Sequence, residues 1–176
     1  MKKSARSIHV SVARQRLTLK RGREVERTFP ISTSKFGLGT EEGSFKTPTG
    51  RFRIAAKIGA GEPLTSAFRA RVPFQPTPGD LQGDDLVMTR ILWLDGLDAA
   101  NANTHSRYIY IHGTNHEELI GTPASHGCIR MRNADVAQLF DLVEVGTPVV
   151  ITPPRARKPT ARKGKKTLRT QTAAPK

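Results

Sequence analysis

The chain has 176 residues, a single cysteine and a formal net charge of +14 at pH 7. This length fits one domain with a core of its own, and one cysteine excludes an internal disulfide. The charge would suggest a nucleic-acid-binding protein, but nine of the 29 Lys and Arg residues fall in positions 154–176, where there is no acid. The rest of the chain is only mildly basic, so composition does not favour that class.

The first ten residues begin with positive charge but contain no apolar stretch of the length that a signal peptide needs. No window approaches the roughly 18 uninterrupted apolar residues of a spanning helix. We therefore expect a protein without a membrane span that is cytoplasmic as the sequence is written. If the start of the chain has been misassigned, the periplasm or cell envelope is the alternative.

Alternation of apolar and polar residues predicts β-strands at the start of the chain. Apolar side chains recur at every second position from Ile8 to Val12, and again at Leu17 and Leu19 after a turn at 14–15. A third strand is predicted over 25–31, and a turn at 47–50 leads into a fourth around 52–56. Three or four antiparallel strands are thus expected to open the fold.

Residues 59–85 lack a regular pattern because eight Gly and Pro residues interrupt them. Connections of this length usually either serve a function or are disordered. We interpret the segment as a long loop or lid beside an active site, with a plain surface insertion as the alternative.

A regular pattern returns after residue 85. Buried strands are predicted at 86–88 and 91–94, and the run 108–113 places two isoleucines on one face before it ends in His112-Gly113. Asn133 is expected to cap a helix whose apolar side chains recur at 136, 139, 140 and 143. Gly146 should end this helix, and a last strand follows at 148–151.

The basic segment 154–176 combines Pro, Thr, Lys and Arg with almost no apolar residue, so it lacks the burial that would offset its ordering entropy. We predict a disordered tail that follows a single domain formed by residues 1–153. One interpretation is a solvated tail. The other is contact with a polyanion such as nucleic acid, anionic lipid or cell-wall polymer.

Cys128 lies in the sequence SHGC at 125–128 and is a candidate nucleophile. A free thiol with a pKa of about 8.5 is mostly protonated at neutral pH, so a nucleophilic cysteine needs a base or a nearby positive charge. His126 lies just before it, His112 lies further upstream at a predicted strand end, and Arg130 follows shortly after it. Each of these three residues is a candidate for activating the thiol.

Acyl transfer also needs donors for the oxyanion that forms when a thiolate adds to a carbonyl. Gly127 would let its own amide and that of Cys128 point at one place, while Gly113 would keep the approach to the imidazole of His112 open. A histidine base needs an acceptor at its other ring nitrogen. For that role we expect a backbone carbonyl near Gly113.

Each of these residues has an ordinary structural alternative. Cys128 could be a small buried hydrophobe. His112 could be a structural histidine at a strand end, and Arg130 could pair with an acid such as Asp135 on the predicted helix. Taken singly, none of them establishes a catalytic site.

A metal site is a further alternative, because three histidines and the cysteine are potential zinc ligands. His112 and His116 would meet one ion most naturally from adjacent turns of a helix. The intervening residues 113–115 follow a strand and make a poor helix, so the spacing of His112 and His116 is unsuited to one ion. The presence of His126 and Cys128 does not change that spacing. We therefore predict neither a metal nor a cofactor.

Together these residues resemble the L,D-transpeptidase catalytic domain, a family that remodels bacterial peptidoglycan. Its hallmark is a His-Gly pair at a strand end followed by Ser/Thr-His-Gly-Cys with a further Arg and Asn. Residues 47–52 and 146–149 also resemble family landmarks, and the resemblance covers roughly residues 7–152. It implies a mainly β domain, a twisted β-sandwich of mixed sheets with one short helix after the nucleophile. The hallmark is matched here by His112-Gly113, residues 125–128, Arg130 and Asn133.

The resemblance also implies a role for each matched residue. Cys128 would attack the carbonyl between the third residue of a tetrapeptide stem and its terminal D-Ala, so that D-Ala leaves and a thioester forms. His112 would be the general base for that step. The other implied roles are oxyanion binding and support for Gly127, Gly113, His126 and Ser125, and binding of substrate carboxylates for Arg130.

Two fates of the thioester follow from the same resemblance. Transfer to an amine makes a cross-link, and transfer to water makes the enzyme an L,D-carboxypeptidase. The expected partners are peptidoglycan stem peptides or muropeptides. Because no signal precedes the first predicted strand, hydrolysis of muropeptides during cytoplasmic recycling is an alternative, and a non-catalytic polyanion-binding module is another.

Overall fold

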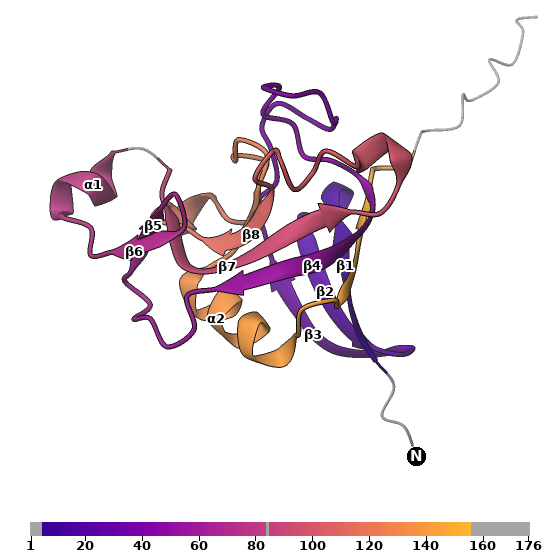
Figure 1. Ribbon diagram of the computed structural model, residues 1–176, viewed down its shortest axis with the longest axis horizontal. Helices are drawn as coiled ribbons and strands as arrows, with labels where there is room; N and C mark the ends of the chain where they lie inside the picture. The colour runs from indigo at the N-terminus through magenta and orange to yellow at the C-terminus, as the bar shows by residue number, and fades with distance from the viewer. Residues whose placement is uncertain (1–4, 84, 156–176) are drawn as a thin grey trace, which may run out of the picture.

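The computed structural model describes residues 5–83 and 85–155. Over these ranges the protein is mainly β, with strands in both relative directions and a helix after Cys128, as the sequence predicted. The predicted sheets are joined by hydrogen bonds into one continuous, strongly curved ladder of ten strands (Figure 1).

Figure 1 labels the two helices and the strands β1 to β8 of the described part of the chain. The strands are β1 Arg6–Ser11, β2 Arg16–Arg21, β3 Glu24–Pro30, β4 Gly50–Ile58, β5 Ala67–Arg69, β6 Val72–Phe74, β7 Val87–Gly96, β8 Tyr110–Gly113, β9 Ile129–Arg130 and β10 Pro148–Thr152. The helices are α1 Pro78–Gln82 and α2 Asn133–Leu142, with short 3-10 turns at Val12–Arg14, Ala99–Asn101 and Glu117–Leu119.

The strands run in the order β3-β2-β1-β10-β4-β7-β5-β6, and β8 pairs with both β7 and β9. The opening strands β1, β2 and β3 are antiparallel neighbours, as predicted from their alternation. The fourth strand does not continue this meander, because β10 inserts between β1 and β4. The first and last strands therefore pair with each other, in parallel, in the middle of the sheet.

Strand β7 is buried on both faces and separates two hydrophobic clusters. Leu92 and Leu94 point into the main core, which α2 covers with Val136 and its neighbours. Ile91 and Trp93 point to the other side, where a smaller cluster includes Phe68, Tyr110 and Cys128. Because successive strand residues face opposite sides, the same strand supports both the core and the face that carries the cysteine.

The segment 59–85, which we expected to be a long loop or lid, contains β5, β6 and α1. Its prolines occupy positions that regular structure tolerates. Pro73 lies in β6, the last strand in the sheet order, and Pro78 is the first residue of α1, where a missing N–H costs little. Thr77 and Asp80 form a reciprocal capping box at the start of that helix.

The prediction that Asn133 caps the helix after the cysteine was wrong. The N-cap position is Arg132, whose side chain makes no capping bond, and α2 begins at Asn133. The Asn133 amide is instead committed to Thr114, accepting from its N–H at 3.0 Å and donating to its carbonyl at 2.9 Å. A tertiary contact thus takes the side chain that local preference would have assigned to the cap.

The last strand, β10, ends at Thr152. The predicted basic tail begins at residue 154, and all of it beyond Arg155 lies outside the described residues. Within the ranges 5–83 and 85–155, no helix has the length and apolar character needed to cross a membrane.

Candidate active site

The site is built on the parallel strand pair β8–β9. Ile111 pairs with Ile129 and both side chains enter the main core. Residues one position away on each strand face the opposite side, because side chains alternate along a strand. That opposite face presents Tyr110, His112, Cys128 and Arg130.

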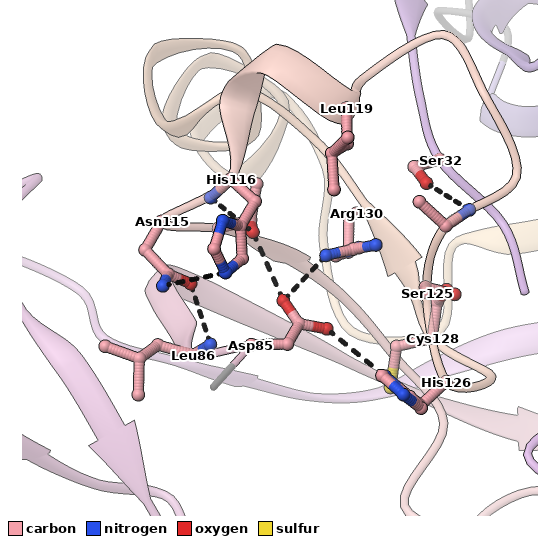
Figure 2. Close-up of polar contacts among 12 residues, drawn as sticks. Ser32, Asp85, Leu86, Asn115, His116, Leu119, Ser125, His126, Cys128 and Arg130 are labelled. Carbon is pink, nitrogen blue, oxygen red and sulfur yellow. Dashed lines mark hydrogen bonds and ion pairs between the residues drawn. The ribbon is translucent and has the colours of Figure 1, made fainter. Parts of the chain in front are cut away.

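A pocket of about 340 Å³ opens at this face. Three of the predicted site residues, His112, His126 and Cys128, line it together with Asp85 and Val87. Figure 2 shows Asp85 between Arg130 and His126, with Cys128 beside His126. The fold thus brings together side chains from β8, from the turn before β9 and from the end of the segment 59–85.

His112 is only 2% exposed, and its Nδ1 lies 2.5 Å from the Gly113 carbonyl. This is the contact expected from the sequence. A carbonyl only accepts hydrogen bonds, so Nδ1 carries the proton and Nε2 keeps its lone pair. Burial lowers the pKa of the imidazole, opposed by the Asp85 charge and the Gly113 carbonyl, so His112 is neutral at pH 7 and able to accept a proton.

The Cys128 sulfur receives the Tyr110 N–H at 3.3 Å, and its thiol donates to the Tyr108 carbonyl at 3.4 Å. Burial is the main cause that raises the pKa of the thiol to about 11, and the Asp85 carboxylate acts in the same direction. The Tyr110 N–H and the charges of Arg130 and Arg107 act in the other direction. The site therefore pairs a neutral thiol with a neutral imidazole.

The turn 125–128 is held by Ser125, whose hydroxyl donates to the Cys128 carbonyl at 2.6 Å and accepts from the Gly127 N–H at 3.3 Å. Gly127 has a φ of +121°, which disfavours any residue with a Cβ. The sequence suggested two free amides here. The Gly127 amide is engaged by Ser125, whereas that of Cys128 donates to no group within the described residues.

Gly113 has a different reason to be glycine from the one expected. A Cβ at this position would collide with the Asn133 amide oxygen and approach the Met88 carbonyl to 2.8 Å. Gly113 therefore makes room for Asn133, which also accepts a hydrogen bond from Thr89 at 2.9 Å. Asn133 in turn fixes the end of the strand that carries His112.

Arg130 lies behind the pocket rather than in its lining. It is 2% exposed, and its Nη1 pairs with the Asp85 carboxylate at 2.9 Å, not with Asp135. Asp85 also accepts from the Thr114 hydroxyl at 3.2 Å and lies 3.9 Å from Nδ1 of His126 (Figure 2). The carboxylate thus joins the buried arginine to the pocket rim.

Asp85 was missed at the level of sequence. An arginine in a buried strand requires a carboxylate partner, and this requirement could have indicated that an acid lies beside Arg130. It does not say which acid supplies the carboxylate, because Asp85 and Arg130 lie 45 positions apart in the chain.

His126 forms the rim of the pocket, with 47% of its side chain exposed. Its ring contacts both Phe36 and Phe45, with centroid distances of 5.7 and 5.9 Å, and the two phenylalanine rings also contact each other at 5.9 Å. A second hollow of about 300 Å³ begins on its other side, lined in part by Phe45 and Tyr108. His126 therefore separates two openings on the surface near Cys128.

His116, the other potential zinc ligand, does not line the pocket. Its Nδ1 lies 3.3 Å from the Glu118 carboxylate, and its Nε2 lies 3.3 Å from the Gly83 carbonyl. Over the described ranges, no three His, Cys, Asp or Glu side chains are grouped so as to hold a metal ion.

Comparisons with known proteins agree with this geometry. Residues 5–151 match the model of the L,D-transpeptidase catalytic domain family (YkuD). The Bacillus subtilis L,D-transpeptidase homologue YkuD is 31% identical over 144 residues, covering 82% of this chain and 64% of that protein. YqjB of the same organism is 50% identical over 60 residues, which are 34% of this chain and 32% of that protein.

A solved L,D-transpeptidase from Mycobacterium smegmatis has the same fold, with a TM-score of 0.56 at 20% identity over 85% of this chain and 59% of that one. The chain spans less than two thirds of the length of these relatives. The similarity therefore concerns the domain that carries the His112 and Cys128 pocket.

Proposed function

This chain belongs to the L,D-transpeptidase catalytic domain family, and we propose that it transfers the acyl group of a peptidoglycan tetrapeptide stem through a thioester on Cys128. Family membership supports a peptidoglycan transpeptidase. The finer proposal, a cysteine mechanism with His112 as base, is supported by one observation above all. The thiol lines the same pocket as a buried imidazole whose Nε2 makes no hydrogen bond with the residues that the structure describes.

The first half-reaction follows from the protonation states. Nε2 of His112 takes the thiol proton as the Cys128 sulfur adds to the carbonyl before the terminal D-Ala. The oxyanion is stabilised by the Cys128 amide, which has no other acceptor within the described residues. His112 then returns the proton to the departing amine, the C–N bond breaks, and D-Ala leaves a thioester behind.

The second half-reaction determines the product. An amine that attacks the thioester carbonyl releases the sulfur and forms a new amide, which is a cross-link when the amine belongs to another stem. Water releases the free tripeptide acid, which is L,D-carboxypeptidase activity. Both routes return the proton to Cys128 through the same imidazole.

The test is to incubate the protein with a disaccharide tetrapeptide and to analyse the mixture by mass spectrometry. We expect loss of D-Ala, an acyl adduct on the intact protein, and either a dimeric or a tripeptide product. Cys128→Ala should form no adduct and release no D-Ala above the uncatalysed level. Equal behaviour of the wild type and Cys128→Ala would refute the proposal.

A further inference from the structure

The hairpin formed by β5 and β6 has a strained turn. Arg69 pairs with Val72, so the turn consists of Ala70 and Arg71 alone. Their φ angles are +48° and +69°. Two-residue turns with both residues in the left-handed region normally use Gly, Asn or Asp, because a Cβ is disfavoured there. Strain of this kind tends to persist where a position serves a function.

The strained turn places the Arg71 guanidinium on an aromatic cluster beside the nucleophile. Its central carbon lies 4.9 Å from the Trp93 ring centroid and 5.2 Å from that of Tyr108. Its Nη1 donates to the Tyr110 hydroxyl at 3.3 Å. The backbone N–H of the same tyrosine contacts the Cys128 sulfur at 3.3 Å. One tyrosine residue therefore separates the guanidinium from the thiol.

Arg71 has no carboxylate partner among the described residues. Arg6, Arg51, Arg53 and Arg130, in contrast, all form ion pairs within the same ranges. A guanidinium that stacks on ring faces keeps the N–H groups along its edge available, and these match the two oxygens of a carboxylate. Arg71 is thus a partly exposed cation, held close to the thiol, without an anion of its own.

We propose that Arg71 binds the C-terminal carboxylate of the donor peptide. This inference rests on the proposed function, in which the bond attacked by Cys128 is the last peptide bond of the stem. The approach of the sulfur to the carbonyl, one terminal residue and a hydrogen bond to its carboxylate together span roughly 10 Å. That length is within the reach set by Tyr110 and its two 3.3 Å contacts, one to the thiol and one to the guanidinium. The role that the sequence gave to Arg130 is thereby assigned to an arginine that is accessible.

The assignment makes Arg71 a specificity-determining residue. It selects donors that end in a free carboxylate one residue after the attacked bond. A donor with a C-terminal carboxamide loses the charge that Arg71 recognises but keeps the same peptide bond. A hydrogen bond to a charged group contributes enough to make the expected discrimination roughly 10- to 100-fold in kcat/KM.

The test compares a disaccharide tetrapeptide with its C-terminal carboxamide. Release of D-Ala or D-alaninamide is followed by mass spectrometry for the wild type, Arg71→Gln and Arg71→Lys. We expect the wild type to prefer the acid roughly 10- to 100-fold, Arg71→Lys to keep part of that preference, and Arg71→Gln to lose it. The matched control is Arg69→Gln on the same hairpin. Arg69 stacks on Phe74 instead, at 4.7 Å, and its variant should keep the full preference.

The outcomes separate the two proposals. Equal turnover of acid and amide by the wild type, or a preference that survives in Arg71→Gln, overturns the role of Arg71 and leaves the proposed function standing. A folded wild type that turns over neither peptide overturns the proposed function and this inference with it. Circular dichroism of each variant establishes that the hairpin substitutions leave the fold intact.

Discussion

The strand pair β8–β9 and the segment 59–85 meet at the same pocket but hold their side chains by different means. In β8–β9 the backbone is fixed on one face by Ile111 and Ile129 in the core, so His112 and Cys128 have little freedom. In the segment 59–85 short strands and a five-residue helix carry side chains such as Arg71 by stacking and by single ion pairs. The groups that we propose react are thus carried by a rigid backbone, and the residue that we propose binds the substrate carboxylate is carried by a more exposed segment.

Substitution of the proposed base, His112, should produce the largest effect on turnover. The size of that effect measures how much the strand pair β8–β9 contributes to catalysis. We expect His112→Gln to lower turnover of the tetrapeptide by about 10²- to 10⁴-fold, because it removes the buried imidazole that we propose takes the thiol proton. The matched variant is His126→Gln at the exposed rim, for which we expect a change of less than about tenfold. Steady-state release of D-Ala measures both. A larger loss in His126→Gln than in His112→Gln would transfer the role of base to His126.

Breaking the ion pair that joins the two regions should be the largest effect on stability. Arg130→Met leaves the Asp85 carboxylate without its buried partner, and we expect the free energy of unfolding to fall by about 3–5 kcal/mol. Urea denaturation measures the change. Adding Asp85→Leu to Arg130→Met should restore part of the loss, because no unpaired charge remains. A cost below about 1 kcal/mol for Arg130→Met would mean that the pair contributes little.

The pH dependence of Cys128 alkylation tests whether the strand pair keeps its thiol neutral. Alkylation requires the thiolate, and burial raises the pKa of Cys128 to about 11. Below that pKa the thiolate fraction grows about tenfold per pH unit, so the rate with iodoacetamide should rise about 100-fold from pH 7 to pH 9. A free thiol such as N-acetylcysteine, measured in parallel, should level off earlier. A plateau for Cys128 below pH 8 would reveal a thiolate already formed at rest.

The smallest effect on stability should come from a substitution confined to the segment 59–85. Thr77→Ala removes the capping box of α1, and we expect a loss of about 1 kcal/mol or less, because the helix is short and exposed. Neither alkylation of Cys128 nor turnover should change. Thermal unfolding measures the stability, and Thr65→Ala on the same segment is a control without a cap. A loss as large as that of Arg130→Met would show that α1 folds cooperatively with the strand pair.

The features that the sequence could predict are those that depend on residues close together in the chain. Alternation identified β1, β2, β4 and β8, since each buries at least one face. The two buried strands predicted at 86–88 and 91–94 form the single strand β7. The sequence SHGC and the His112-Gly113 pair pointed to the residues that line the pocket and that we propose react, because the residues of each motif lie within a few positions of one another. Local patterns of this kind can be recognised from the sequence without knowledge of the tertiary structure.

Contacts between distant side chains could not be predicted in the same way. The structural alternative for Arg130 was an ion pair with an acid on α2, and its partner is Asp85 instead. Asn133 was expected to cap α2 and instead binds Thr114. Both errors come from choosing the nearest partner in sequence. The insertion of β10 beside β1 escaped prediction for the same reason, because a pairing between the two ends of a domain leaves no local signal.

That pairing has a mechanical consequence. Strands β1 and β10 run parallel, so the chain enters the pair at one end through Ala5 and leaves it at the other through Thr152. A force applied to the two ends of the domain therefore acts along the strands and loads all their mutual hydrogen bonds at once. The hydrogen bonds between β1 and β10 must therefore break together rather than one after another. The domain should for this reason resist stretching better than one whose terminal strands separate one hydrogen bond at a time.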